Sequence, residues 1–396
     1  MVKIPEHRFE ERLTKLRTKL SKDKIAHFVV FNPTHIYYLT GFVHIPTERP
    51  FALVVQESEI SFFVPELEKQ HVEEEVPHAS KVGTYFDYPD AKHPMKHLAN
   101  FLKKELHITG HLGAEAPGSS GRWGYEGPKL EEVLGFPVQV FPQLLTDMRI
   151  IKDEDELACI RDSAMWANLA HQFLQDNTRV GANEVEVSAV ASLKASLAMG
   201  KALGIAYRPF TFSGLPVHAG YRGQIGTYSA IPHAMTRFAV FQPGDTLVTG
   251  ASANVAGYYA ELERTMFLGP PNEKQQKHFA IMMEAQDAAI DAFAPGVPCS
   301  KVDKAARTIF QKHGVMNLVQ HHTGHAIGLE GHEKPFLDHG MDVIMEPGMV
   351  FTVEPGIYDR GLGGFRHSDT IFITEEGMEI VTYYPRDIDY LTITSQ

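Results

Sequence analysis

The sequence predicts an α+β protein of two domains, a smaller α/β domain over residues 1–147 and a larger domain over residues 148–396. The chain has 396 residues, and about 150 residues per domain leaves room for two or three separate cores. Apolar runs alternate with helical patterns through the first domain, which is typical of α/β folds. After residue 150, long helices are mixed with strand runs of the antiparallel kind, which indicates an α+β domain.

In the first domain, apolar residues at helical spacing predict an amphipathic helix over residues 8–22. Residues 26–31 form an apolar run typical of a buried strand. Residues 51–55 and 60–64 are two further apolar runs, and we expect them to pair as a hairpin.

The second domain is expected to contain three long helices, over residues 152–174, 185–199 and 278–294. The first of them begins with acidic residues, which the helix dipole stabilises there. Strands are expected over residues 246–249, 264–268, 350–353 and 370–374.

Charge and composition exclude several classes of partner. Lys plus Arg number 37 and Asp plus Glu 49, a net charge of −12. A nucleic-acid-binding surface needs clustered Lys and Arg, and no such cluster appears. No apolar run approaches the ~20 residues that span a bilayer, and no secretory signal is recognisable, so we expect a cytoplasmic protein without membrane contact. The two cysteines, Cys159 and Cys299, exclude a disulfide framework and a cysteine-based zinc site.

Polar groups suited to chemistry gather in five segments of the second domain, each beside a glycine, a proline or a strand end. Glu354 ends an apolar run, where a carboxylate loses hydration unless it meets a cation or a metal ion. Glu261 and Glu263 are two residues apart, so on a strand both face the same side. Two other segments contain His233 and His325. Taken singly, each residue also fits an ordinary role as a solvated or satisfied side chain.

The order and spacing of these segments resemble the creatinase, prolidase, aminopeptidase P and methionine aminopeptidase superfamily. The resemblance extends from residue 148 to about residue 380 and implies the pita-bread fold for the second domain, and a homodimer. The phrases that carry it are Gly244-Asp245, Gly257-Tyr258, Thr323-Gly324-His325, the run from Met349 to Gly356, and the run from Arg366 to Thr370.

Metallopeptidases of this superfamily hold two divalent ions on five ligands, in the order Asp, Asp, His, Glu and Glu. The resemblance places these ligands on Gly250, Glu261, His325, Glu354 and Ser368. Two of the five positions lack a carboxylate, so we do not expect a dinuclear site, because two divalent ions need compensating negative charge. A single ion on the other three remains open, since one His with two carboxylates is a known arrangement for one metal.

Creatinase works without a metal and lacks the same two carboxylates. The sequence over residues 256–268 resembles the corresponding strand of creatinase. The resemblance places the catalytic histidine of creatinase on His233 and its guanidinium-binding glutamate on Glu263. The segment beginning at Arg49 resembles the one whose arginine reaches the substrate carboxylate, so Arg49 and nearby Phe51 are expected to contact substrate.

Other substrate contacts are expected from Glu261, Cys299 and His332, the last two through their counterparts in the superfamily. Cys299 also fits a buried, unreactive thiol. Arg366 is expected to pair with Asp369 or Glu354. The remaining histidines of the His-rich region, His321, His322 and His339, are expected on the surface or in loops. One departure is that the chain looks a few residues shorter than creatinase between His325 and Glu354, so the second carboxylate-binding arginine of creatinase has no clear counterpart.

The function expected on these grounds is metal-independent hydrolysis of a C–N bond in a small amidino, guanidino or cyclic amidine carboxylic acid, creatine-like or ectoine-like. His233 would act as general acid and base, Glu263 and Glu354 would hold the cationic group, and His325 would complete the catalytic set. No cofactor or metal is expected in this interpretation. The alternatives are an Xaa-Pro dipeptidase or aminopeptidase with an altered single-metal site, and a non-catalytic pita-bread protein that binds a partner.

Overall fold

The computed structural model describes residues 3–119, 127–204, 207 and 214–394. The chain folds as two compact units, one over Ile4–Arg149 and the other beginning at Ile150. Among the described residues, no helix combines the length and the apolar character needed to cross a membrane.

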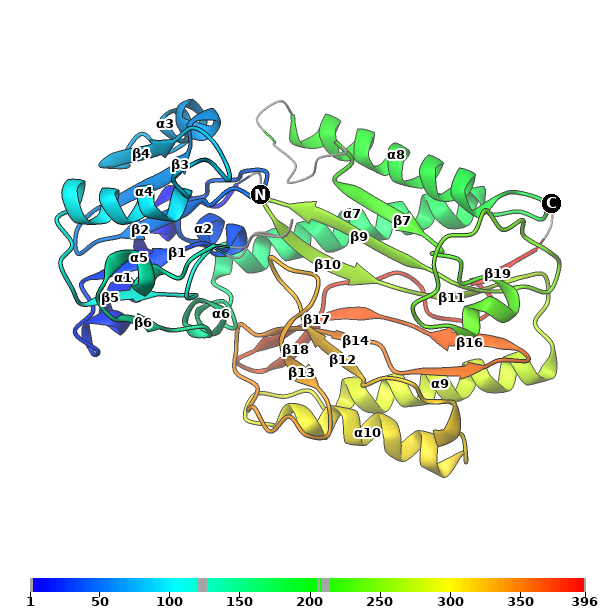
Figure 1. Ribbon diagram of the computed structural model, residues 1–396. Helices are drawn as coiled ribbons and strands as arrows, with labels where there is room; N and C mark the ends of the chain where they lie inside the picture. Colours follow the sequence, from blue (N-terminus) through cyan, green and yellow to red (C-terminus); the bar gives the residue numbers. More distant parts are fainter. Residues whose placement is uncertain (1–2, 120–126, 205–206, 208–213, 395–396) are drawn as a thin grey trace. The chain divides into compact units, whose positions relative to one another are not determined.

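A six-stranded mixed sheet forms the centre of the N-terminal unit, in the order β4-β3-β2-β1-β5-β6 (Figure 1). The predicted hairpin is confirmed, since β2 and β3 pair antiparallel with Val55 opposite Ile60. β5 pairs parallel with β1 on the other side. The strands are β1 (His27–Val30), β2 (Ala52–Val55), β3 (Ile60–Pro65), β4 (Lys81–Tyr85), β5 (Leu112–Ala114) and β6 (Val138–Val140).

The helices of the N-terminal unit are short except for the first. The amphipathic helix predicted over residues 8–22 is confirmed as α1, which buries Leu13, Leu16 and Leu20. A second apolar cluster joins Val54 and Phe63 of the sheet to Leu98 of α4. The helices are α1 (Glu6–Ser21), α2 (Pro33–Thr40), α3 (Lys69–Glu75), α4 (Pro94–Asn100) with a π-helical turn over Phe101–Glu105, α5 (Leu130–Leu134) and α6 (Leu144–Met148), with a 3₁₀ turn over Glu66–Glu68.

The second unit is built from antiparallel strands flanked by two pairs of helices (Figure 1). Its sheets have the orders β10-β9-β7, β19-β11-β8, β13-β12-β14-β17-β18 and β15-β16. The strands are β7 (Val217–Gly220), β8 (Thr246–Val248), β9 (Gly250–Val255), β10 (Tyr258–Leu262), β11 (Thr265–Leu268), β12 (Gly324–Ala326), β13 (Glu333–Leu337), β14 (Val350–Val353), β15 (Gly356–Asp359), β16 (Gly363–Arg366), β17 (Asp369–Thr374), β18 (Gly377–Ile380) and β19 (Thr392–Ile393).

Helix α7 (Glu154–Asn177) fixes the position of β10, the strand that contains Glu261. It begins at Asp153, whose side chain accepts hydrogen bonds from the backbone of Glu156 and Asp155, while Glu156 accepts one from the backbone of Asp153. This capping box explains the acidic first turn predicted from the sequence. About two turns further along the helix, Ser163 Oγ accepts from Ala260 N of β10 at 2.9 Å, so the helix holds β10 through the backbone of that strand.

The other helices of this unit are α8 (Glu184–Leu203), α9 (Glu273–Asp291) and α10 (Cys299–Lys312), and 3₁₀ turns lie over Gly226–Ala230 and Met316–Leu318. α9 begins five residues before the predicted start, because Asn272 caps it through the backbone of Gln275. α10 is absent from the predicted helices, although buried Val302, Ala306 and Phe310 repeat every four residues along it. That spacing is an ordinary helical signal.

A fully buried arginine joins the strands that surround the polar segments. Arg264 is 0% exposed, and its Nη2 donates to Asp369 Oδ1 at 2.8 Å and to the carbonyl of Tyr384 at 2.8 Å. Its Nη1 donates to the carbonyls of Glu263 and Ser368. Because these acceptors come from three separate segments, this one side chain fixes the β10–β11 junction against the start of β17 and the C-terminal segment.

We predict that Arg264→Met lowers the free energy of unfolding of the second unit by about 3–5 kcal/mol, because the buried Asp369 would keep only a long contact to Arg386, at 3.9 Å, as its ion pair. Arg161→Met is the matched control, since Arg161 pairs with Glu379 at 2.7 Å but the two side chains are 50% and 44% exposed. An exposed pair of that kind contributes about 0–1 kcal/mol. Urea unfolding of both variants measures the difference, and equal losses would contradict the assigned role of Arg264.

Candidate active site

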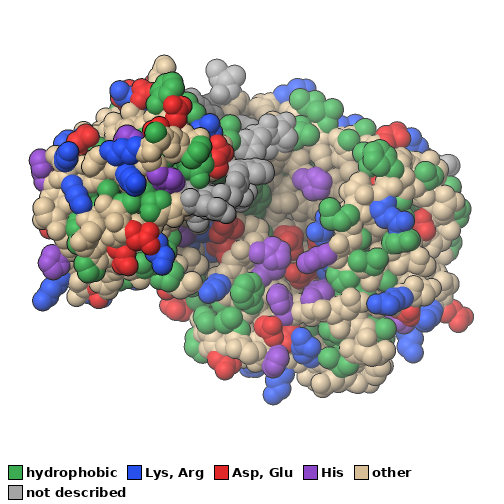
Figure 2. All heavy atoms as spheres, viewed as in Figure 1, with side chains coloured by type: hydrophobic (Ala, Val, Ile, Leu, Met, Phe, Trp, Pro, Cys, Tyr) green, Lys and Arg blue, Asp and Glu red, His purple; other side chains and the backbone are tan. Residues whose placement is uncertain are grey.

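Three side chains far apart in the sequence meet in one pocket of the second unit. Glu261 lies in β10, His325 in β12, and Glu354 directly after β14. One ligand atom of each lies within 4.8 Å of the others. Histidine and acidic side chains are also seen together in a hollow on this unit's face (Figure 2). The structure therefore brings together three of the residues singled out from the sequence.

Strand pairing explains this convergence. β12 and β14 are antiparallel neighbours in one sheet, with Ala326 opposite Phe351, so His325 and Glu354 come from adjacent strands. Glu261 belongs to a different sheet. Its backbone N–H donates a hydrogen bond to Thr370 Oγ1 of β17 at 2.9 Å. Because β17 pairs with β14, this contact brings β10 against the same sheet.

The imidazole of His325 is oriented as a ligand. Its Nδ1 lies 3.0 Å from the carbonyl oxygen of Ala326, so Nδ1–H donates there and Nε2 faces the carboxylates. Nε2 is buried, has no hydrogen-bond partner among the described residues, and lies 3.4 Å from Glu354 Oε1. The ring stacks on His332, with centroids 3.8 Å apart. Metal-binding histidines are commonly held in this way by a backbone carbonyl.

The pocket concentrates negative charge, and the pKa values reflect it. Burial and the charges of Glu354 and Glu263 raise the pKa of Glu261 to about 7. Burial lowers the pKa of His325, but its contact with Glu354 and the charge of Glu261 outweigh burial and raise it. Burial raises the pKa of Glu354, but His325 and Arg366 outweigh burial and lower it. The cluster thus favours a bound cation. When no other cation is present, the cluster retains a proton instead.

Arg366 neutralises part of this charge. Its Nη2 donates to Glu263 Oε1 at 2.8 Å, and its Nε donates to the other oxygen of the same carboxylate. Nε also lies 3.7 Å from Glu354 Oε2, and Nη1 donates to Tyr358 OH at 3.0 Å. Of the two partners expected for Arg366, Glu354 is confirmed by the 3.7 Å ion pair, whereas Asp369 pairs with Arg264 instead. The expectation that Glu263 holds a substrate cation is wrong, because Arg366 already occupies its carboxylate.

The two positions without a carboxylate border the same pocket. Ser368 Oγ donates to Glu261 Oε1 at 2.8 Å. A Cβ at Gly250 would lie 3.5 Å from Glu263 Oε1. Both positions therefore face the glutamates, as the resemblance implied, but neither adds charge. The ligand set suits one divalent ion rather than two.

Two predicted histidines lie at the edge of this cluster. Burial lowers the pKa of His332, and the charges of His325 and His233 lower it further, while Glu354 opposes them. His332 is therefore neutral at pH 7, and His233 is close enough to influence it. His321 was expected on the surface or in a loop, and it lies in a loop, half-buried. Its Nε2 lies 2.7 Å from Tyr358 OH, which places it in the hydrogen-bond network of Arg366.

Cys299 is not available for chemistry. It begins α10 and is 0% exposed, and burial raises its thiol pKa to about 12. A thiolate does not form at pH 7 under these conditions, so the structure favours the buried, unreactive thiol over a substrate contact.

Arg49 and Phe51 belong to the N-terminal unit. Arg49 Nη1 donates to Glu48 Oε1 at 2.7 Å, and its side chain is 34% exposed. Phe51 is buried and stacks on His44, with ring centroids 3.8 Å apart. This packing identifies Phe51 as a core residue of its unit, and the substrate contact expected of Arg49 stays a prediction.

Sequence reasoning missed two cations of the second unit. Lys152 Nζ donates to Glu333 Oε2 at 3.0 Å, and both side chains are buried; this pair lies next to His332. Arg222 Nη2 lies 3.5 Å from Glu263 Oε1. Arg222 stands in no recognisable motif. Lys152 ends the segment from Met148 that resembles the superfamily's lead-in to the first helix of this domain, but nothing in the sequence indicated either pairing.

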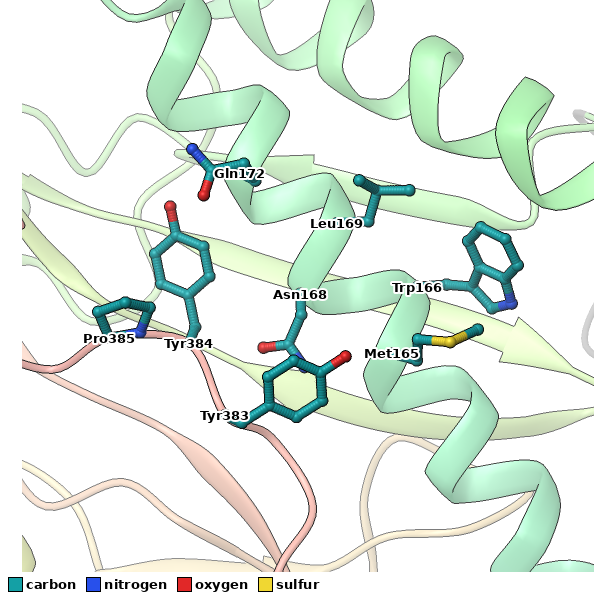
Figure 3. A pocket seen from close by; sticks show the side chains of 8 residues that line it. All are labelled: Met165, Trp166, Asn168, Leu169, Gln172, Tyr383, Tyr384 and Pro385. Carbon is teal, nitrogen blue, oxygen red and sulfur yellow. The ribbon is translucent and has the colours of Figure 1, made fainter.

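A separate groove lies between α7 and the segment Tyr383–Pro385, with a volume of about 420 Å³ (Figure 3). Its lining contains no acidic or histidine side chain, so the chemistry belongs to the glutamate pocket. The lining residues are Met165, Trp166, Asn168, Leu169, Gln172, Tyr383, Tyr384 and Pro385.

We predict that Arg366→Met destabilises the second unit by about 3–5 kcal/mol, because it leaves the buried Glu263 with only the longer contact to half-exposed Arg222. The double variant Glu263→Met with Arg366→Met should recover most of that loss, since removing both partners leaves no unpaired charge. Urea unfolding in buffer containing a chelator measures both. A double variant no more stable than the single one would show that the pair does not act as a unit.

Comparison with known proteins identifies families that match both units of the chain. Residues 158–375 match the model of "Metallopeptidase family M24", and residues 12–123 match that of the "Creatinase/Prolidase N-terminal domain". The chain is 30% identical to an Xaa-Pro dipeptidase from Lactobacillus delbrueckii subsp. lactis, over 96% of this chain and 99% of that protein. It superposes on the prolidase from Pyrococcus horikoshii OT3 with a TM-score of 0.77 at 27% identity, covering 96% and 99% of the two chains.

A recombinant prolidase from Thermococcus sibiricus gives a TM-score of 0.80 at 25% identity, covering 97% and 99% of the two chains. These findings overturn the expected metal-independent amidinohydrolase, because the relatives are named as Xaa-Pro dipeptidases and prolidases. The expected proximity to the creatinase branch is likewise unsupported, because the relatives are prolidases and Xaa-Pro dipeptidases. The pita-bread fold and the hydrolase class predicted from the sequence hold, and the chain belongs to metallopeptidase family M24.

Proposed function

We propose that this protein is a peptidase that hydrolyses the peptide bond of Xaa-Pro dipeptides with one divalent ion held by Glu261, His325 and Glu354. The convergence of these three side chains carries the proposal, with ligand atoms within 4.8 Å of one another. The names of the relatives, Xaa-Pro dipeptidase and prolidase, support the choice of substrate.

The residues present fit such an ion. His325 Nε2 is buried without a hydrogen-bond partner in the described part of the chain, while its Nδ1–H is held by a backbone carbonyl. Two carboxylates and an imidazole form a donor set that suits Mn²⁺, Co²⁺ or Zn²⁺. An ion here would also replace the protons that the crowded carboxylates otherwise retain.

When bound, a divalent ion would polarise the peptide carbonyl and lower the pKa of a water molecule. The chain's own residues supply the remaining functions. Arg366 pairs with Glu263 and helps to lower the pKa of Glu354, so that Glu354 stays available as a ligand. His332 is neutral at pH 7 because burial lowers its pKa, so its imidazole can accept a proton in the pocket. His233, close to His332, is a candidate for passing a proton to the leaving nitrogen.

Two other expectations stay predictions at this point. These are the homodimer implied by the resemblance and the cytoplasmic location. Neither is needed for the ligand set, because Glu261, His325 and Glu354 all belong to the same unit of one chain.

We predict that protein stripped with a chelator regains Xaa-Pro hydrolysis when Mn²⁺, Co²⁺ or Zn²⁺ is added. His325→Ala should lower kcat/KM by at least about 100-fold, because it removes a ligand and not merely an outer partner. His78→Ala is the control, since His78 is exposed in the N-terminal unit. The assay follows release of proline from Ala-Pro and Leu-Pro, with Ala-Ala and creatine beside them.

Full activity in the presence of the chelator would remove the metal from the mechanism. Turnover of none of the Xaa-Pro dipeptides with any of the three ions would remove the proposed substrate class.

A further inference from the structure

Arg222 is an incompletely paired cation at the edge of the glutamate pocket. Its side chain is 47% exposed, and Nη2 lies 3.5 Å from Glu263 Oε1 and donates to Gln224 Oε1 at 3.3 Å. Gln224 is 1% exposed, and its amide nitrogen has no hydrogen-bond partner in the described part of the chain. The buried amide nitrogen of Gln224 is thus a donor without an acceptor, and the half-exposed guanidinium of Arg222 beside it keeps donors that a ligand can reach.

The backbone holds Arg222 in an uncommon conformation. Its φ is 51°, in the left-handed region that non-glycine residues rarely adopt. The next residue, Gly223, donates to Glu184 Oε2 at 2.8 Å, and a Cβ there would lie 2.1 Å from the carbonyl oxygen of Met235. The turn is therefore fixed from both sides, and a strained residue held in this way is typical of functional sites.

The two arginines that approach Glu263 differ in how many of their hydrogen-bond donors remain open to a ligand. Arg366 is 3% exposed and its donors are taken by Glu263 and Tyr358. Arg222 is half exposed and makes two long contacts. A second ligand can therefore reach the guanidinium of Arg222 but not that of Arg366.

We infer that Arg222 binds the free α-carboxylate of the substrate, so that the enzyme selects dipeptides over amidated or longer peptides; this rests on the function proposed above. In a dipeptide the carboxylate is about one residue, or ~3.8 Å, from the scissile bond. An anion that close to Glu261, Glu263 and Glu354 is repelled unless a cation meets it. A guanidinium supplies that charge and can pair with both carboxylate oxygens.

The test compares Arg222→Met, Arg222→Lys and the wild-type holoenzyme on Ala-Pro and on Ala-Pro amide. We expect Arg222→Met to raise KM for Ala-Pro about 10- to 100-fold with little change in kcat, because a charge-assisted contact made equally in substrate and transition state is lost. KM for the amide should not change, and Arg222→Lys should be intermediate for Ala-Pro. Arg179→Met is the matched control, since Arg179 is 64% exposed and lies 3.7 Å from Glu186.

A merely structural role would change both substrates alike and lower the melting temperature, whereas the exposure of Arg222 predicts a shift of no more than about 2 °C. Equal KM values of the wild type for Ala-Pro and its amide would overturn the assignment while leaving the proposed function intact. If the wild type hydrolyses neither, the proposed function fails. The role of Arg222 is then tested by calorimetric titration, which compares the affinities for N-acetyl-L-proline and N-acetyl-L-prolinamide. Preference for the free acid that disappears in Arg222→Met supports the carboxylate site, and no preference overturns it.

Discussion

The crowding of three glutamates in one buried pocket is the constraint on which the rest of the site depends. Burial and the charges of Glu354 and Glu263 raise the pKa of Glu261, and carboxylates without water need cations close by. Arg366 supplies one of these cations and occupies Glu263 with two donors. What remains is a smaller group, Glu261 and Glu354 with His325, which is still short of positive charge. This division separates the pocket into a structural ion pair and a ligand set.

The scaffold keeps that division in place. Glu261 and Glu354 come from different sheets, and their approach depends on contacts between β10 and β17, such as the hydrogen bond from Glu261 N to Thr370 Oγ1. Arg264 reinforces the same junction from below the pocket, where it has no access to solvent. The strand that carries the ligand and the arginine that holds the strand are therefore neighbours in the sequence, with Arg264 three residues after Glu261.

Sequence reasoning succeeded where the signal was local. Glu354 was identified as a site residue because a charged group ended an apolar run, and α7 and the β2–β3 hairpin followed from apolar spacing and turns. α10 had an equally clear spacing and was overlooked. The pairing of Arg366 with Glu263 could not be predicted, because the two residues lie more than one hundred positions apart in the sequence. The β-bridge between Glu263 and Ser368 brings them together. Arg222 had no signal, since its contact with Glu263 arises from a turn in the left-handed conformation.

The error about function has a physical origin. The loss of carboxylates at Gly250 and Ser368 was interpreted as favouring a metal-free site over a single ion, although it removes charge for only one of two ions. The surviving ligands lie close enough for a single ion, and the orientation of His325 suits one. The most direct test of this account is the metal content of the purified protein after saturation with Mn²⁺ or Zn²⁺ and removal of excess ion, measured by inductively coupled plasma mass spectrometry. The account predicts one tightly bound ion per chain, reduced to background in Glu354→Gln but not in Glu346→Gln, whose side chain is exposed. Two ions per chain, or none, would contradict it.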